Sequence, residues 1–277
     1  GAAGAARVVS RRARVAGATL KGYSPPPTVP CPYPKEATVS GIWGNREVPW
    51  IPPELAEPDG FVGVGGDLRP ATLLRAYADG VFPWFNEGDP ILWWSPDPRG
   101  VIELHGESAD GAPGYGGLHV SRRLARTIRS GKFRVTVNQC FATVMRECGE
   151  RRPEGTWVTP EMLAGYAELH RLGHAHSLET WVWAGGAGPD AWELAGGTYG
   201  VSIGGLFAAE SMFYRVTDGS KVALAALVQR LRERGYVLLD VQMKTDHTTT
   251  MGATEVPRRE YLKRLRRAVA MTGISFA

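Results

Sequence analysis

Apolar positions in the first half of the chain recur at helical spacing. Several segments place apolar residues three or four positions apart with polar residues between them, which is the pattern of a helix with one buried face. The segment at 160–173 opens with Thr159 and Pro160, a helix cap followed by a residue that suits the first turn. The predicted helices cover residues 71–79, part of 120–134, 139–151 and 160–173.

The second half of the chain has shorter apolar runs, which are rich in branched residues and bounded by glycine. This pattern predicts strands. An amphipathic helix at 220–235 interrupts the strands, and a basic helix at 260–271 follows them. Helices early and strands clustered late predict an α+β fold with a mixed, largely antiparallel sheet. The predicted strands cover residues 133–137, 174–182, 236–242 and two runs within 196–215.

Three polar residues stand out on the apolar strands within 196–215 and at 236–242. Residues 196–215 predict two strands around a glycine turn at 202–205, and Glu210 lies near the end of the second. Asp240 and Gln242 lie two positions apart on the next strand, so alternation should place their side chains on the same face. Polar groups on apolar strands are costly unless they have partners or a task. We therefore expect a catalytic centre here.

Length and cysteine content set wide limits. A chain of 277 residues can bury a substantial core in one or two domains. No apolar run approaches the ~20 residues that a membrane helix needs. Cys31, Cys140 and Cys148 lack the spacing of a zinc site or a disulfide framework, which favours a reducing compartment.

The basic charge belongs mainly to residues 1–40. This segment holds six Arg and Lys residues against Glu36 alone, whereas the whole chain carries a net charge of +4. Acid-poor, Arg-rich N-termini are typical of organellar transit segments, which would place the protein in a chloroplast or mitochondrion. The alternative is a disordered leader that carries no targeting signal. In either case, the overall charge does not by itself indicate a nucleic-acid ligand.

Some motif-like strings do not support a cofactor or a metal. Residues 219–221 (GSK) lack the upstream glycine of a phosphate loop, so we expect Ser220 to cap a helix instead. His170, His174 and His176 lie close together, but no nearby carboxylate or cysteine completes a ligand set. We predict neither a metal nor a cofactor.

Two clusters of cations are local patches on a nearly neutral body. Arg122, Arg126 and Arg129 share one helical face in a segment that lacks acidic residues. A second cluster occupies residues 258–267. Each cluster alone fits a solvated helix face. Beside the aromatic residues at 82–85, which can stack on a base, the clusters equally fit a polyanion contacted at a few phosphates.

Motifs spread over residues 60–262 resemble one enzyme family. They occur in the order GGDL, FPWF, PILWWSPDPR, HVSR, EGTWVT, LGHAHSLE, GLFAAESMF, DVQ, DH and GATEVPRREYL. Together they resemble leucyl/phenylalanyl-tRNA–protein transferases. Members of that family move Leu or Phe from aminoacyl-tRNA onto an N-terminal Arg or Lys, which marks the acceptor protein for degradation. The resemblance implies a cytoplasmic, monomeric enzyme that needs no cofactor. It also implies a small N-terminal domain (41–97) and a larger domain similar to GCN5-type N-acetyltransferases (98–277), after a leader at 1–40.

The resemblance also implies roles for the three polar residues. Asp240 would orient the side-chain amide of Gln242, and the pair would position the acceptor amine and help it to lose a proton. Glu210 would accept a hydrogen bond from an ammonium group. An ordinary carboxylate is a weak base at neutral pH, so positioning outweighs proton removal in this scheme.

The remaining implied roles concern the aminoacyl-tRNA. Phe207 lies on the strand that lines the aminoacyl pocket in the family, and Thr198 replaces a frequent Met there. Trp84 and Trp157 match the aromatic residues that enclose the terminal adenosine. Arg122, Arg126 and Arg129 match the helix that grips the acceptor stem, with Ser130 in place of the last cation. Two alternatives are an acyl-CoA-dependent N-acetyltransferase and a non-catalytic tRNA-binding protein.

Overall fold

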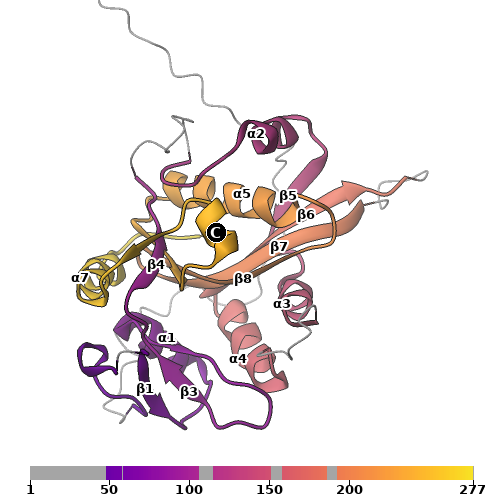
Figure 1. Ribbon diagram of the computed structural model, residues 1–277. Coiled ribbons are helices and arrows are strands. Elements are labelled where there is room, and N and C mark those ends of the chain that lie inside the picture. The colour runs from indigo at the N-terminus through magenta and orange to yellow at the C-terminus, as the bar shows by residue number, and fades with distance from the viewer. Residues whose placement is uncertain (1–47, 58, 106–114, 151–157, 186–191, 277) are drawn as a thin grey trace, which may run out of the picture.

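The computed structural model describes residues 48–57, 59–105, 115–150, 158–185 and 192–276, and it contains two sheets (Figure 1). The first sheet has three antiparallel strands in the order β1-β3-β2 and packs against helix α1. The elements of this part of the chain are a short 3-10 helix (η2, Pro53–Leu55), β1 (Phe61–Val64), α1 (Pro70–Asp79), β2 (Phe82–Pro83) and β3 (Leu92–Trp94).

Local chemistry fixes both ends of α1. The Asp67 carboxylate accepts hydrogen bonds from the Arg69 amide at 3.0 Å and the Thr72 hydroxyl at 2.6 Å, and Pro70 takes the first helical position. Gly80 ends the helix in the left-handed conformation with a φ of 83°. This sharp end turns the chain toward β2 and points the Gly80 carbonyl at the second sheet.

The second sheet has seven strands in the order β10-β4-β9-β8-β7-β6-β5. All its pairs are antiparallel except β8 with β9, which confirms the predicted α+β class with a mixed, largely antiparallel sheet. Its strands are β4 (Arg99–Ile102), β5 (Phe133–Val137), β6 (Ala175–Trp183), β7 (Trp192–Ile203), β8 (Leu206–Tyr214), β9 (Leu238–Gln242) and β10 (Thr254–Val256).

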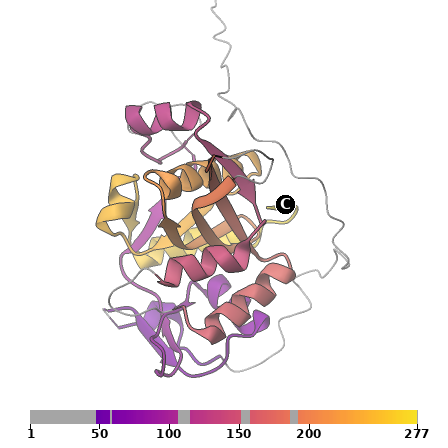
Figure 2. The ribbon, with the colours of Figure 1, turned by 90° about the vertical axis from the view of Figure 1, so that its right-hand side faces the viewer.

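Helices cover both faces of this sheet (Figures 1 and 2). One face packs against α5, while α3, α4 and the small domain lie against the other. None of the helices in the described ranges is both long and apolar enough to cross a membrane. The helices are α2 (Arg122–Arg129), α3 (Phe141–Glu150), α4 (Pro160–Arg171), α5 (Gly219–Glu233), α6 (Asp246–Thr250) and α7 (Arg258–Val269).

Two bulges interrupt the neighbouring strands β8 and β9. In β8, Ala209 pairs with Gly200 and Ser211 pairs with Tyr199, which leaves Glu210 as the extra residue. In β9, Asp240 and Gln242 pair with successive residues of β4, which leaves Val241 as the extra residue. Bulges bend a strand and redirect its side chains. The bulge at Val241 does not by itself test the common face predicted for Asp240 and Gln242, which stays a prediction.

Most predicted elements are present, with two differences. Strand β7 begins at Trp192, four residues before the predicted start, and extends the hairpin with β6. The predicted cap of α5 is wrong, because Asp218 occupies the cap position with a φ of 72° and Ser220 lies buried inside the first turn. The leader at 1–40 lies outside the described residues. The boundary at residue 97 falls between β3 and β4 and stays a prediction.

Candidate active site

Asp240 lies fully buried at the centre of the large sheet, and four donors surround its carboxylate. Arg99 donates to both oxygens, from Nε to Oδ1 at 2.9 Å and from Nη2 to Oδ2 at 2.7 Å. The Tyr261 hydroxyl donates to Oδ2 at 2.7 Å, and the Gln242 amide donates to Oδ1 at 2.9 Å. Each oxygen thus accepts two hydrogen bonds, which is the full capacity of a carboxylate.

Arg99 is buried as deeply as its partner. Its third contact is a donation from Nη1 to the Gly80 carbonyl at 3.1 Å, and its guanidinium lies over the rings of Phe82 and Tyr261. Burial lowers the pKa of Arg99, but the charges of Asp240, Tyr261 and Glu210 and the hydrogen bonds to Asp240 together outweigh burial, so the pKa lies above its usual value. Because Arg99 is bidentate, stacked and charged, it locks Asp240 in one orientation.

Gln242 reaches the second carboxylate of the site. Its side-chain Nε2 donates to Glu210 Oε1 at 2.9 Å, across from β9 to β8. The main chain of Gln242 has a φ of 56°, a left-handed conformation that is uncommon outside glycine. The hydrogen bond from its amide to Asp240 holds this conformation. Gln242 is therefore fixed through its main chain by Asp240 and through its side chain by Glu210.

Glu210 lies among polar groups from four other elements, α1, α4, β4 and β9. Its Oε2 faces the Tyr166 hydroxyl of α4 at 3.5 Å, and that hydroxyl bonds to the Tyr77 hydroxyl of α1. Burial raises the pKa of Glu210 to about 8, against the lowering effect of a hydrogen bond with Tyr77. The nearby charge of Asp240 acts in the same direction as burial, while Arg99 and Tyr166 oppose it. The small domain, through Tyr77, thus contributes to the environment of Glu210.

The geometry corrects one predicted relationship within the site. The structure does bring Asp240, Gln242 and Glu210 together, as expected. However, Asp240 contacts the main-chain amide of Gln242, and Glu210 holds the side-chain amide. The expectation that Asp240 orients the side-chain amide is therefore wrong.

Four residues of this network carried no role predicted from the sequence. Arg99 was part of a recognised string (PDPR), and Tyr261 was part of another (EYL), but neither carried a predicted role. Tyr77 and Tyr166 fit their helical patterns as ordinary core positions. The only available signal was the presence of an arginine among buried strand residues, since a buried cation demands a partner.

Phe207 and Thr198, the predicted pocket residues, are both fully buried. Phe207 stacks on Phe276 with ring centroids 5.1 Å apart and also contacts the ring of Tyr236. The Thr198 hydroxyl donates to the Ser211 carbonyl at 3.0 Å. Phe207 belongs to the core beneath α5, whereas the Glu210 carboxyl faces α1 and α4. The aminoacyl pocket stays a prediction.

Trp84 lies at the surface of the small domain with 44% of its area exposed. Its ring meets Trp94 edge-on, with centroids 5.9 Å apart, and its carbonyl accepts a hydrogen bond from Trp94 Nε1 at 2.8 Å. An exposed indole held by its neighbour is a suitable platform for a base. Its predicted partner in binding adenosine, Trp157, lies outside the described residues.

The two cation clusters differ in their contacts. On α2, Arg122, Arg126 and Arg129 are exposed along one face, and Ser121 caps the helix by accepting from the Leu124 amide at 3.2 Å. The cluster at 258–267 is partly used within the protein. Arg258 is buried and donates to the Ser95 and Ala56 carbonyls, while Arg264 pairs with Glu103 and Glu260. Of the two clusters, α2 therefore better fits a polyanion.

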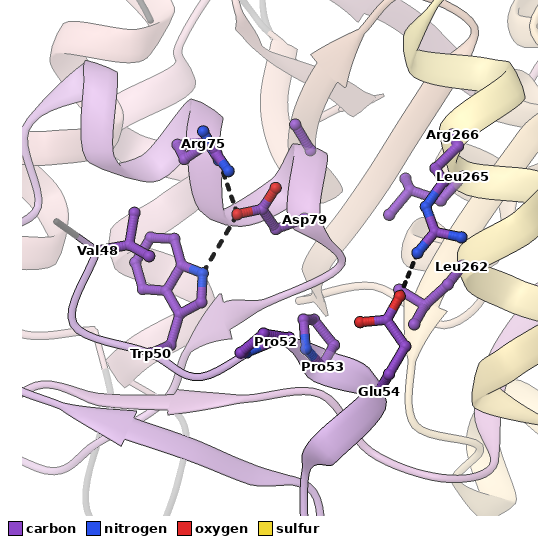
Figure 3. Close-up of a pocket in the computed structure, with 11 residues that line it drawn as sticks. Val48, Trp50, Pro52, Pro53, Glu54, Arg75, Asp79, Leu262, Leu265 and Arg266 are labelled. Carbon is purple, nitrogen blue, oxygen red and sulfur yellow. Dashed lines mark hydrogen bonds and ion pairs between the residues drawn. The ribbon is translucent and has the colours of Figure 1, made fainter. Parts of the chain in front are cut away.

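A cavity of about 290 Å³ lies between the small domain and α7, away from the polar network (Figure 3). Asp79 lies in one wall of the cavity and accepts hydrogen bonds from Arg75 Nε at 2.7 Å and from Trp50 Nε1 at 3.3 Å. Glu54 pairs with Arg266 on the other side. The carboxylates of Asp79 and Glu54 thus already have partners that line the same cavity. The lining of the cavity includes none of the three predicted catalytic residues.

Comparisons with known proteins agree on one family. The family model described as leucyl/phenylalanyl-tRNA protein transferase matches residues 115–266, and the model of the N-terminal domain of that family matches residues 66–97. A leucyl/phenylalanyl-tRNA–protein transferase of Anaeromyxobacter sp. (strain Fw109-5) is 50% identical over 227 residues, which are 81% of this chain and 88% of the relative. The transferase of Nitrosomonas europaea is 43% identical over 234 residues, or 84% of this chain and 91% of the relative.

A solved structure also matches, at a much lower level. A tandem GNAT protein from the clavulanic acid biosynthesis pathway aligns with 69% of this chain and 57% of its own, at 18% identity and a TM-score of 0.32. That similarity is too low to carry an argument. The assignment rests on the matched family models and on identity over most of both chains. The chain belongs to the leucyl/phenylalanyl-tRNA–protein transferase family.

Proposed function

We propose that the protein transfers Leu, and also Phe or Met, from aminoacyl-tRNA to the N-terminal Arg or Lys of an acceptor protein. The product is a new peptide bond, and the added residue marks the acceptor for degradation. The observation that carries this proposal is the network of Asp240, Gln242 and Glu210 in a chain of this family. We further propose that the enzyme acts as a cytoplasmic monomer, where aminoacyl-tRNA and acceptor proteins meet.

The reaction is the aminolysis of an ester, which needs a positioned amine and a site for its proton. Gln242 supports positioning, because Glu210 holds its Nε2 and leaves its carbonyl oxygen without a donor among the described residues. That oxygen can accept from the acceptor ammonium, and the Glu210 carboxylate lies next to it. Asp240 acts behind Gln242 as a positioning residue. Fixed geometry of this kind lowers the entropic part of the barrier.

The aminoacyl-tRNA is proposed to bind across both domains. Arg122, Arg126 and Arg129 would contact phosphates of the acceptor stem, and Trp84 would stack on the terminal adenosine together with Trp157. Phe207 and Thr198 would line the pocket for the Leu or Phe side chain. Thr198 is smaller than the Met frequent in the family, so the pocket depth should differ at this position.

An acyl-CoA-dependent acetyltransferase fits the structure less well. Such an enzyme would bind a pyrophosphate at the N-terminus of the helix that follows β8, where main-chain amides attract anions. In this protein, the acidic Asp218 occupies the start of α5 and bonds to Arg123 at 2.8 Å. Gly219 is packed so closely on β7 that an added Cβ would lie 2.5 Å from the Ala195 carbonyl oxygen. A pyrophosphate at the N-terminus of α5 would therefore be repelled by the charge of Asp218 and would find little space beside Gly219.

A non-catalytic tRNA-binding protein also fits less well. Binding alone would not require a buried carboxylate with four donors, because burying such a charge is costly without a task. It would also leave the strained conformation of Gln242 without a purpose. The cationic face of α2 would serve such a protein equally well, so the polar network discriminates between the two functions.

The direct test is a transfer assay. The protein is incubated with Leu-tRNA and a peptide that begins with Arg, and the Leu-Arg product is measured by mass spectrometry. The same peptide beginning with Asp serves as a control for acceptor specificity, and acetyl-CoA replaces Leu-tRNA as a control for the donor. Absence of product with folded protein would refute the proposed activity, whereas acetylation of the peptide would support the acetyltransferase.

A further inference from the structure

The two carboxylates of the site differ in their free capacity for a proton. Asp240 is fully buried, and its two oxygens already accept four hydrogen bonds. A proton from the substrate would have to displace Arg99, Tyr261 or the Gln242 amide. Glu210 retains some exposure, and its firmest contact is the Gln242 side-chain amide at 2.9 Å. Only Glu210 combines access with unused lone pairs.

We propose that Glu210 is the general base that accepts the proton of the acceptor ammonium, and that Asp240 stays ionised as a positioning residue. This inference rests on the proposed function. It separates two tasks that the family resemblance assigned to the pair of Asp240 and Gln242. The bulge at Glu210 supports it, because the extra residue directs this carboxyl toward Gln242 and away from the regular strand.

The proposed step moves one proton of the ammonium to Glu210 and joins the nitrogen to the ester carbonyl carbon. An N–H bond of the ammonium breaks, and its proton moves to Glu210. The freed lone pair forms the N–C bond at the ester carbonyl, whose π electrons move to the oxygen. When this intermediate collapses, the C–O bond to the ribose breaks, and the ribose oxygen leaves with a second proton from the nitrogen. Glu210 then returns its proton to water.

The groups around Glu210 set its basicity to suit this task. Tyr77 of α1, Tyr166 of α4, Asp240 and Gln242 of β9, and Arg99 of β4 all face it or act on it through charge. Burial raises its pKa to about 8, and the Tyr77 hydroxyl bond limits the rise. A base works best when its pKa lies near the working pH, since it is then both partly ionised and strong enough.

The first variant is Glu210→Gln, which keeps the size and polarity of the side chain. With Leu-tRNA and an arginyl peptide, we expect kcat to fall by ~10²–10⁴-fold, the usual contribution of a general base. Hydroxylamine is unprotonated at neutral pH and needs no base. The enzyme-dependent cleavage of Leu-tRNA by hydroxylamine, measured above the rate without protein, should therefore fall far less in Glu210→Gln than transfer to the peptide. Unchanged affinity for Leu-tRNA would show that the variant is folded. A wild-type kcat, or an equal loss with both nucleophiles, would overturn the proposal.

The second variant distinguishes the titration of Glu210 from that of the acceptor amine, because the pKa of an α-amine is also close to 8. In the wild type, kcat should rise with pH as Glu210 loses its proton. Tyr77→Phe removes a hydrogen bond that lowers the pKa of Glu210, so the rise should move to higher pH. The pKa of the peptide amine would not change, and an unmoved profile would overturn the proposal. Failure of the wild type to form any product would instead refute the proposed function.

Discussion

Asp240 holds Gln242 by its main chain, not by its side chain. The Gln242 amide donates to Asp240 Oδ1 at 2.9 Å, and the Gln242 side-chain Nε2 donates to Glu210 Oε1 at the same distance. The contact with Asp240 also stabilises a left-handed φ of 56° at Gln242. Any change at Asp240 should therefore act on the reaction through the position of Gln242.

Asp240→Asn tests this indirect role. The variant keeps an acceptor for the Gln242 amide but removes the negative charge beside Arg99. We expect kcat to fall by roughly 10²-fold, the size of effect that a ~1 Å misplacement produces. The affinity for Leu-tRNA, measured by filter binding, should stay within about twofold because Asp240 is fully buried. An equal loss of tRNA binding would mean that Asp240 supports the whole fold.

Arg99→Met tests how far the network depends on its buried cation. The change leaves a fully buried carboxylate without its charged partner, which typically costs about 3–5 kcal/mol. We expect the free energy of unfolding, measured in urea, to fall by that amount. Arg69→Met is the matched control, since Arg69 pairs with Asp67 at the surface and such pairs contribute about 0–1 kcal/mol. Equal losses in both variants would contradict the assigned role of Arg99.

The sequence predicted the fold class and the three polar residues because their signals are local. Apolar spacing identified the helices and strands, and Asp240, Gln242 and Glu210 were conspicuous on apolar strands. The bulges at Glu210 and Val241 left no such signal, since a bulge changes the register without changing the composition. The contact of Asp240 with the main-chain amide of Gln242, in place of the expected side-chain amide, left no local signal either.

The partners of the site could not be predicted from the sequence because they are distant along the chain. Arg99 meets Asp240 across 141 residues, and Tyr77 meets Tyr166 across 89 residues. Each is an ordinary residue in its own segment, and only the folded chain reveals the contact. Likewise, Asp218 occupies the cap position of α5 in a left-handed conformation, without a side-chain cap hydrogen bond. Asp and Ser are equally favoured at a cap, so local preference did not distinguish Asp218 from Ser220.

The raised pKa of Glu210 also predicts a dependence of stability on pH. Burial raises the pKa of Glu210 from 4.5 to about 8 in the folded protein, so the folded state holds a proton that the unfolded state releases above about pH 4.5. The wild type should therefore lose up to ~1.4 kcal/mol of stability for each pH unit as pH rises through this window. Urea unfolding of Glu210→Gln should lack this contribution. Parallel curves for both proteins would contradict the raised pKa.

Arg126→Ala tests the cationic face of α2. Loss of one phosphate contact should weaken binding of Leu-tRNA and Phe-tRNA to a similar extent. It should also reduce the slope of log K against log salt concentration by about 0.7–0.9. Arg171→Ala is the control, because Arg171 is an exposed residue of α4 that pairs with Glu168. A slope equal to that of the wild type, or a loss limited to one tRNA, would contradict a phosphate contact.

Trp84→Ala tests the proposed platform for the terminal adenosine. Stacking of one base on an aromatic side chain contributes about 1–3 kcal/mol, so KM for Leu-tRNA should rise by roughly 5-fold to 150-fold. A minimal donor, leucyl-adenosine, should lose affinity by the same factor because it lacks every other part of the tRNA. Trp183→Ala is the matched control, since that indole is also half exposed but lies on the β6–β7 hairpin. If Trp84→Ala weakened Leu-tRNA but not leucyl-adenosine, Trp84 would contact another part of the tRNA.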